Sequence, residues 1–205
     1  MSAAIDYVDH AILMYQLKNV FGIDDIAMKW ITPFLSDRSQ QISYNGKLSI
    51  SIRIPCGVPQ GSVLDPLLCL LYFAELFELI SQCGFGAHCY AGDAQVFTSS
   101  PSSGVAAAVE SFSSCIEQID RWLKSNRLKL VVEKTQVIWL GTRQQLAKVH
   151  TDEIQLLYTS VPIFSTVMDL GVTLDSSLTM SQHVAAVFQL RSATSATCSE
   201  AITIE

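Results

Sequence analysis

The dipeptide Asn45-Gly46 lies between two runs in which apolar residues alternate with polar ones. Ile42 and Tyr44 alternate before it, and the alternation resumes over residues 48–54 after it. A period of two is typical of strands, and Asn-Gly favours a tight turn whose two central residues have positive φ. The sequence therefore predicts a β-hairpin here, the most constrained local structure in the chain.

Three further strand segments follow. A second hairpin is predicted over residues 84–98, with a tight turn at Gly92-Asp93 because glycine tolerates the backbone that such turns need. Residues 136–140 and residues 168–174 are each predicted to form one strand.

The first two helices are predicted from their end signals. Asp6 is a candidate N-cap with Asp9 in the first turn, and Gly22 ends the apolar periodicity. A second helix is expected from Asp24, and Pro33 should kink or end it.

Two longer helices are expected after the first hairpin. Residues 64–80 follow a Gly/Pro-rich loop, and residues 105–126 carry apolar side chains at helical spacing. Residues 192–205 lack periodicity and are predicted to be a loose tail. Helices and hairpins mix without a β-α-β rhythm, so the predicted fold class is α+β.

Composition limits the number of domains and the cellular location that we expect for this chain. With 205 residues and 49% hydrophobic content, the chain can form one domain with a core, or one domain with an appendage. The most apolar stretch, residues 66–73, is too short to span a bilayer, and residues 1–10 lack the features of a signal peptide. Six cysteines without a Cys-x-x-Cys pair suit reduced thiols, so we expect an intracellular protein without a membrane span.

The charge balance gives little support to strong nucleic-acid binding. The formal net charge is −6, whereas nucleic-acid-binding domains usually carry a basic surface. One modest basic stretch contains Arg121, Lys124, Arg127, Lys129 and Lys134. A solvated helix end explains this stretch as well as a nucleic-acid contact does.

Five segments together resemble a known family. Residues 3–10 (AAIDYVDH), 57–68 (GVPQGSVLDPLL) and 90–93 (YAGD) resemble, in order and spacing, motifs A, B and C of the reverse transcriptases of non-LTR (LINE-type) retrotransposons. Residues 125–135 and 170–175 resemble the family's motifs D and E. The string Gly-Val-Pro-Gln-Gly-Ser is the most specific of these matches.

The resemblance implies a fold and a chemistry. It implies a palm, meaning an antiparallel sheet with helices packed on one face, over residues 1–175, without the fingers region. Residues 176–205 would hold the start of the thumb and a loose tail. The family transfers nucleotides with two Mg²⁺ ions held by three aspartates, on an RNA template with a DNA primer.

Two of those aspartates are expected to be missing. Counting back from Asp6, the motif A ligand would fall one position before Met1. Gly92 occupies the position of the first motif C aspartate, which leaves Asp93 as the surviving metal ligand. We therefore expect Mg²⁺ not to bind and polymerisation not to occur.

Other positions that the resemblance singles out concern substrate binding. Gln60 and Gly61 match the family residues that position template and nucleotide. Ile5 replaces an aromatic residue that screens the sugar, and Asp65 replaces a glycine.

Four functional readings remain open from the sequence. The first is a retrotransposon remnant without polymerase activity, whose template and primer partners are then lost. The second is a reverse transcriptase that is still active with a partner. The third is a binding module for nucleic acid or protein built on the leftover palm, and the fourth is a decayed sequence without function.

Overall fold

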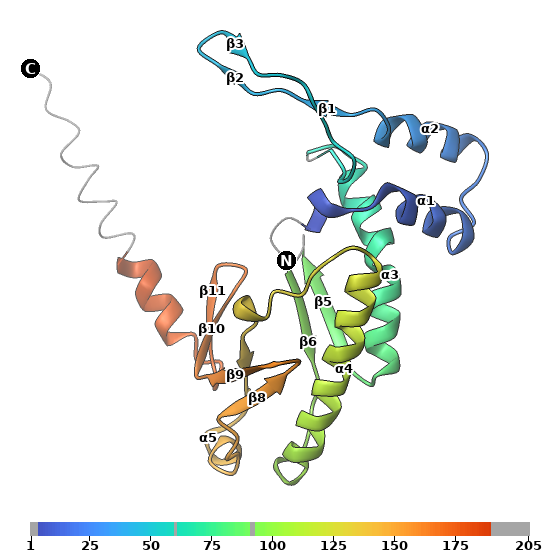
Figure 1. The fold of residues 1–205 in the computed structure, drawn as a ribbon. Helices are drawn as coiled ribbons and strands as arrows, with labels where there is room; N and C mark the ends of the chain where they lie inside the picture. Colours follow the sequence, from blue (N-terminus) through green and yellow to red (C-terminus); the bar gives the residue numbers. More distant parts are fainter. Residues whose placement is uncertain (1–3, 60, 91–92, 190–205) are drawn as a thin grey trace, which may run out of the picture. The chain divides into compact units, whose positions relative to one another are not determined.

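A computed structural model describes residues 4–59, 61–90 and 93–189 of the chain. Figure 1 follows the chain through its helices and strands, coloured from blue at the N-terminus to red. The chain divides into two compact units. Unit 1 comprises Met1–Ser99 and Ser114–Val131, and unit 2 comprises Ser100–Ser113 and Val132–Glu205. Helices and short strands are mixed in the order of the chain, which agrees with the predicted α+β class.

Unit 1 begins with a 3₁₀ helix, η1 (Ala4–Tyr7), and the helix α1 (His10–Asn19). Asp9 is the N-cap of α1, and its side chain accepts a hydrogen bond of 3.0 Å from the Ile12 amide. The predicted cap, Asp6, instead lies inside η1. The prediction was wrong because both aspartates precede the apolar periodicity, and the sequence alone could not choose between them.

The second helix, α2 (Ile26–Leu35), begins near its predicted position and contains Pro33 in its last turn. The helix ends soon after the proline, as expected. Ile26 and Trp30 are 78% and 73% exposed, whereas Leu35 at the end of the helix is buried.

The first predicted hairpin is confirmed. Strand β2 (Ser43–Tyr44) pairs with β3 (Lys47–Leu48), and farther from the turn β1 (Ser39–Gln40) pairs with β4 (Ile52–Arg53). Asn45 and Gly46 have φ values of 47° and 74°, the double positive φ that an Asn-Gly turn provides.

The core of unit 1 involves α1, α3 (Asp65–Gln82) and the second half of α4 (Val105–Ser125). Both long helices start and end within two residues of the predicted bounds. Tyr72 of α3 is fully buried, and its hydroxyl donates a hydrogen bond of 2.8 Å to the Asn126 carbonyl. The buried apolar side chains from these helices include Leu13, Leu17, Leu68, Phe73, Leu76, Ile80, Ile116, Ile119 and Leu123.

The second hairpin consists of β5 (Gly86–Tyr90) and β6 (Asp93–Phe97), with β5 packed against α3. Tyr90 pairs with Asp93, so Asp93 is the first residue of a strand. Asp93 thus belongs to a strand rather than to the predicted turn, and Gly92 lies outside the described residues. At the other end of the hairpin the register pairs Gly86 with Phe97.

Unit 2 contains a three-stranded sheet in the order β7 (Val137–Ile138), β9 (Thr159–Phe164) and β8 (Glu153–Leu156). The predicted strand over residues 168–174 is instead a hairpin of β10 (Thr166–Asp169) and β11 (Val172–Asp175). Leu170 and Gly171 turn the chain with φ values of 47° and 83°. The prediction missed the turn because Leu170 gives no turn signal and Gly171 was read as part of a continuous strand.

Short helical elements complete the described residues. They are η2 (Ser102–Gly104), η3 (Val132–Lys134), α5 (Arg143–Leu146) and a helix over residues 181–189. Within the described ranges, no helix has both the length and the apolar character needed to cross a membrane. The predicted tail over residues 192–205 lies outside the described residues, and the domain boundary after residue 175 stays a prediction.

Candidate functional site

The segment before α1 and the loop that opens at Gly57 are joined through their backbones. The Gly57 amide donates a hydrogen bond of 2.8 Å to the Val8 carbonyl, and Asp9 forms an antiparallel bridge with Cys56. The resemblance assigns these two segments to motifs A and B. The structure therefore brings together two motifs that lie far apart in the sequence.

Gly57 is required at this junction by both backbone angle and space. Its φ is +81°, and a Cβ built there would lie 2.7 Å from the Asp6 carbonyl oxygen. No L-amino acid with a side chain avoids both the positive φ and the contact with backbone. The close approach explains, in physical terms, why a glycine opens the Gly-Val-Pro-Gln-Gly-Ser string.

Two side chains converge on the Gly57 carbonyl. The Nε2 of His10 lies 2.8 Å from this oxygen, and the Arg38 guanidinium donates to it at 2.6 Å. His10 follows the N-cap of α1, and Arg38 immediately precedes β1. Sequence reasoning missed both contacts, because nothing in the local pattern around Arg38 indicates a partner so distant in the chain.

The rest of the loop leads into α3. Val58 is buried, and the Ser62 hydroxyl accepts a hydrogen bond of 3.1 Å from the Asp65 amide at the start of α3. Gly61 has a φ of +78° with open space around its Cβ direction. The role of Gly61 in substrate binding stays a prediction, and Gln60 lies outside the described residues.

Asp65 is accommodated inside the first turn of α3. Its side chain is buried, and the Cys69 thiol donates to its carboxylate at 3.7 Å. Burial, with a smaller contribution from Asp65, raises the pKa of Cys69 to about 12. The thiol is thus protonated at neutral pH and acts as a weak donor to the carboxylate.

Asp93 is exposed at the start of β6. Burial raises the pKa of the Cys89 thiol on the paired strand, and the charge of Asp93 contributes to that shift. The sequence of the hairpin from Gly86 to Phe97 contains one carboxylate, and the position before it is a glycine. Gly92 itself lies outside the described residues, and of Ile5 the structure describes the backbone alone.

The metal chemistry of the family does not fit this hairpin. A two-metal site needs several carboxylate ligands, and magnesium prefers such oxygen donors. Across residues 4–59, 61–90 and 93–189, no three histidine, cysteine, aspartate or glutamate side chains form a group that could hold a metal ion. Asp93 supplies one ligand where the chemistry requires more.

An ion pair links the start of α1 to the segment after α4. The Asp9 carboxylate lies 2.7 Å from the Arg127 guanidinium, and the Asp9 side chain is 12% exposed. Arg127 has a φ of 57° and follows Asn126, whose carbonyl accepts from Tyr72. The motif D region thereby contacts the motif A segment through the Asp9–Arg127 ion pair, and it contacts α3 through the Tyr72–Asn126 hydrogen bond.

The predicted basic stretch is partly engaged in internal contacts. Lys124 pairs with the buried Asp120 at 2.5 Å, and Arg121 donates to the Glu117 carbonyl at 3.4 Å. Lys129 is exposed. Four of the five cations belong to unit 1, whereas Lys134 belongs to unit 2, so the structure does not place them as one surface.

Comparison with known proteins agrees with the motif assignment. A family model described as reverse transcriptase (RNA-dependent DNA polymerase) matches residues 1–162. The RNA-directed DNA polymerase from mobile element jockey of Drosophila melanogaster is 26% identical over 191 residues. That match covers 91% of this chain and 20% of the relative, so the chain spans about a fifth of the relative's length.

The match to the family model covers most of the chain, and the relative is the polymerase of a mobile element. Both findings confirm the resemblance to retrotransposon polymerases that the five motifs indicated. The chain therefore belongs to the reverse transcriptase (RNA-dependent DNA polymerase) family.

Proposed function

We propose that this chain is a palm-type reverse transcriptase domain of a LINE-type retrotransposon that has lost its metal-dependent polymerase step. The observation that carries the proposal is Gly92, which stands where the family pattern has a metal-binding aspartate. The hydrogen bonds between the segments of motifs A and B support the view that the scaffold persists around this change.

The size of the expected loss follows from the role of the metals. They activate the primer hydroxyl and offset the charge that develops on the transferred phosphate. Removing such a clamp costs several kcal/mol of transition-state stabilisation, and each ~1.4 kcal/mol is a tenfold loss in rate. With Asp93 as the remaining motif C acid, we expect synthesis to fall below detection.

Primer extension on an RNA template tests this proposal, with Mg²⁺ or Mn²⁺ and an active reverse transcriptase as positive control. We expect no template-dependent DNA synthesis. Synthesis that is abolished by Asp93→Asn would overturn the proposal and favour the second reading, an active enzyme. Repeating the assay with an intact reverse transcriptase added tests whether a partner restores activity.

Metal binding gives a readout that does not depend on turnover. Gly92→Asp places a second carboxylate beside Asp93, so we expect Mn²⁺ to bind more tightly to this variant than to the wild type. Asp93→Asn in the same background should reverse the gain. Equal Mn²⁺ affinity for all three proteins would show that these positions do not form the metal site.

A second candidate function is nucleic-acid binding without catalysis, supported by Arg121 in α4 and by the exposed Lys129 in the segment after that helix. Binding through phosphates weakens steeply as salt rises. A titration over a salt series should give a shallower slope for an Arg121→Gln/Lys129→Gln variant than for the wild type. Lys148→Gln, an exposed lysine in unit 2, is the matched control.

A further inference from the structure

The hairpin around Asn45-Gly46 differs in charge from the rest of the chain. No acidic residue lies between Asp37 and Asp65, and the charged side chains in that interval are Arg38, Lys47 and Arg53. This is the longest acid-free interval in a chain whose net charge is −6. Within this interval no carboxylate would repel a polyanion.

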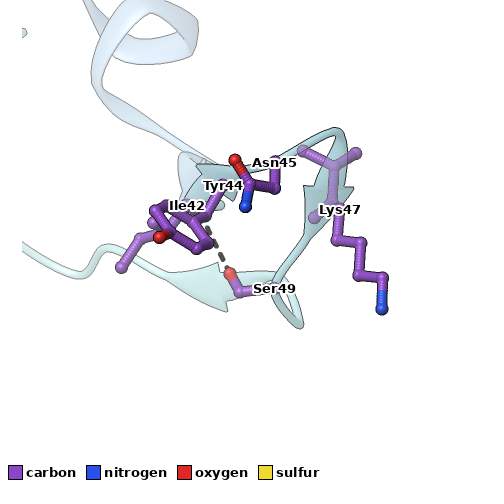
Figure 2. A pocket seen from close by; sticks show the side chains of 6 residues that line it. Ile42, Tyr44, Asn45, Lys47 and Ser49 are labelled. Carbon is purple, nitrogen blue, oxygen red and sulfur yellow. Dashed lines mark hydrogen bonds between the residues drawn. The ribbon is translucent and has the colours of Figure 1, made fainter.

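Two of these three cations already have partners within the protein. Arg38 donates to the Gly57 carbonyl, and Arg53 lies 3.4 Å from Asp37. Lys47, at the tip, is exposed and extends away from the neighbouring side chains in Figure 2. Lys47 is thus an exposed cation at the tip, whereas Arg38 and Arg53 make contacts within the protein.

A shallow pocket at the tip is lined by Ile42, Tyr44, Asn45, Lys47, Leu48 and Ser49 (Figure 2). Tyr44 is 76% exposed, and Ile42 and Leu48 are 67% and 66% exposed. Tyr44 pairs across the hairpin with Lys47, so an exposed ring and a cation flank the same turn. Such a pair suits an unpaired nucleotide, because a ring stacks on a base and a cation pairs with a phosphate.

The tip is held in shape before any ligand arrives. The Ser49 hydroxyl accepts from the Ile42 amide at 2.9 Å, and the Ser49 amide donates to the Ile42 carbonyl at 2.9 Å. The Gln41 side chain also donates to the Ser49 carbonyl. Together with the Asn45-Gly46 turn, these bonds fix the strands that carry Tyr44 and Lys47, which lowers the entropy cost of binding.

We propose that this hairpin tip, residues 42–49, is a contact site for single-stranded nucleic acid, in which Tyr44 stacks on a base and Lys47 pairs with a phosphate. The inference rests on the nucleic-acid-binding role proposed above and adds a surface separate in sequence from the motifs of the family. Single strands are favoured over duplex because stacking requires an unpaired base face.

The test uses the full chain and fluorescence anisotropy with a short labelled single-stranded RNA, at low salt and over a salt series. Tyr44→Ala should weaken binding about tenfold, whereas Tyr44→Phe keeps the ring and should bind like wild type. Tyr158→Ala is the matched control, since Tyr158 is 97% exposed at the turn between β8 and β9. Circular dichroism of each variant checks that the fold is retained.

The Lys47→Gln variant tests the phosphate contact separately. Losing one phosphate contact to a single strand should lower the slope of log affinity against log salt by about 0.7. If wild type binds RNA and only Arg121→Gln/Lys129→Gln weakens it, the hairpin proposal fails while the binding function stands. If wild type does not bind at low salt, both fail.

A self-association surface would give a different pattern. The exposed apolar side chains of the hairpin could instead cover a second copy of the chain. Sedimentation of wild type as a dimer, conversion to monomer by Tyr44→Ala, and unchanged RNA affinity would overturn the proposal in favour of that alternative.

Discussion

The carboxylate of Asp9 both caps α1 and pairs with Arg127, a residue that lies beyond α4 in the chain. One oxygen accepts from the Ile12 amide at 3.0 Å, and the other lies 2.7 Å from the Arg127 guanidinium. This single side chain thereby starts a helix and fixes the segment that follows another one. The motif A segment and the motif D region are in direct contact through this side chain.

Arg127→Ala should destabilise the protein by about 1.5–3 kcal/mol, because the largely buried Asp9 carboxylate loses a charged partner. Arg53→Ala is the control: Arg53 and its partner Asp37 are both largely exposed, so its loss should cost less than about 0.5 kcal/mol. Urea denaturation monitored by circular dichroism compares the two. Equal effects would argue against a structural role for the Asp9 pair.

Gly57→Ala should destabilise more than Gly84→Ala, by at least about 1 kcal/mol. The two glycines have φ values of 81° and 82°, so the backbone strain of alanine is the same at both. At Gly84 the added Cβ meets open space, whereas at Gly57 it meets the Asp6 backbone. Thermal denaturation of both variants isolates the steric contribution, and equal shifts would contradict the close approach.

Tyr72→Phe should cost about 1–3 kcal/mol, since the Asn126 carbonyl loses its buried donor while the ring still fills its place. The exposed Tyr158→Phe should leave the free energy of unfolding unchanged. Denaturant titrations measure both variants. A neutral Tyr72→Phe would mean that water replaces the hydroxyl.

Stability should fall as pH rises from about 9 towards 12. Burial raises the pKa values of Cys69, Cys115 and Tyr72 to about 12, above the ordinary values of 9.0 for the thiols and 10.0 for tyrosine. The folded state therefore holds protons that the unfolded state releases in this range, and folding is favoured fully only below it. Urea midpoints measured between pH 7.5 and 10.5 should decrease, and Cys69→Ala should flatten that decrease. A midpoint independent of pH would contradict the shifts.

Local signals in the sequence predicted several elements well. Asn45-Gly46 gave the hairpin and its turn, because two positive φ values are inexpensive for that dipeptide. Helix α4 followed from apolar residues at helical spacing, and α3 was predicted to follow the Gly/Pro-rich loop. The hairpin at Leu170-Gly171 was missed because a leucine at positive φ gives no turn signal and Gly171 alone did not indicate one. Strands β8 and β9 were not predicted, although buried and exposed residues alternate along β8.

The sequence by itself determined the family motifs, the glycine at position 92 and the local hairpins and helices, because turn chemistry and periodicity act over a few residues. The tertiary structure alone decided that Gly57 meets the Asp6 backbone, that Arg127 pairs with Asp9 and that Tyr72 reaches Asn126. These contacts join distant segments, and their partners are selected by the packing of the whole core rather than by any pattern near each residue.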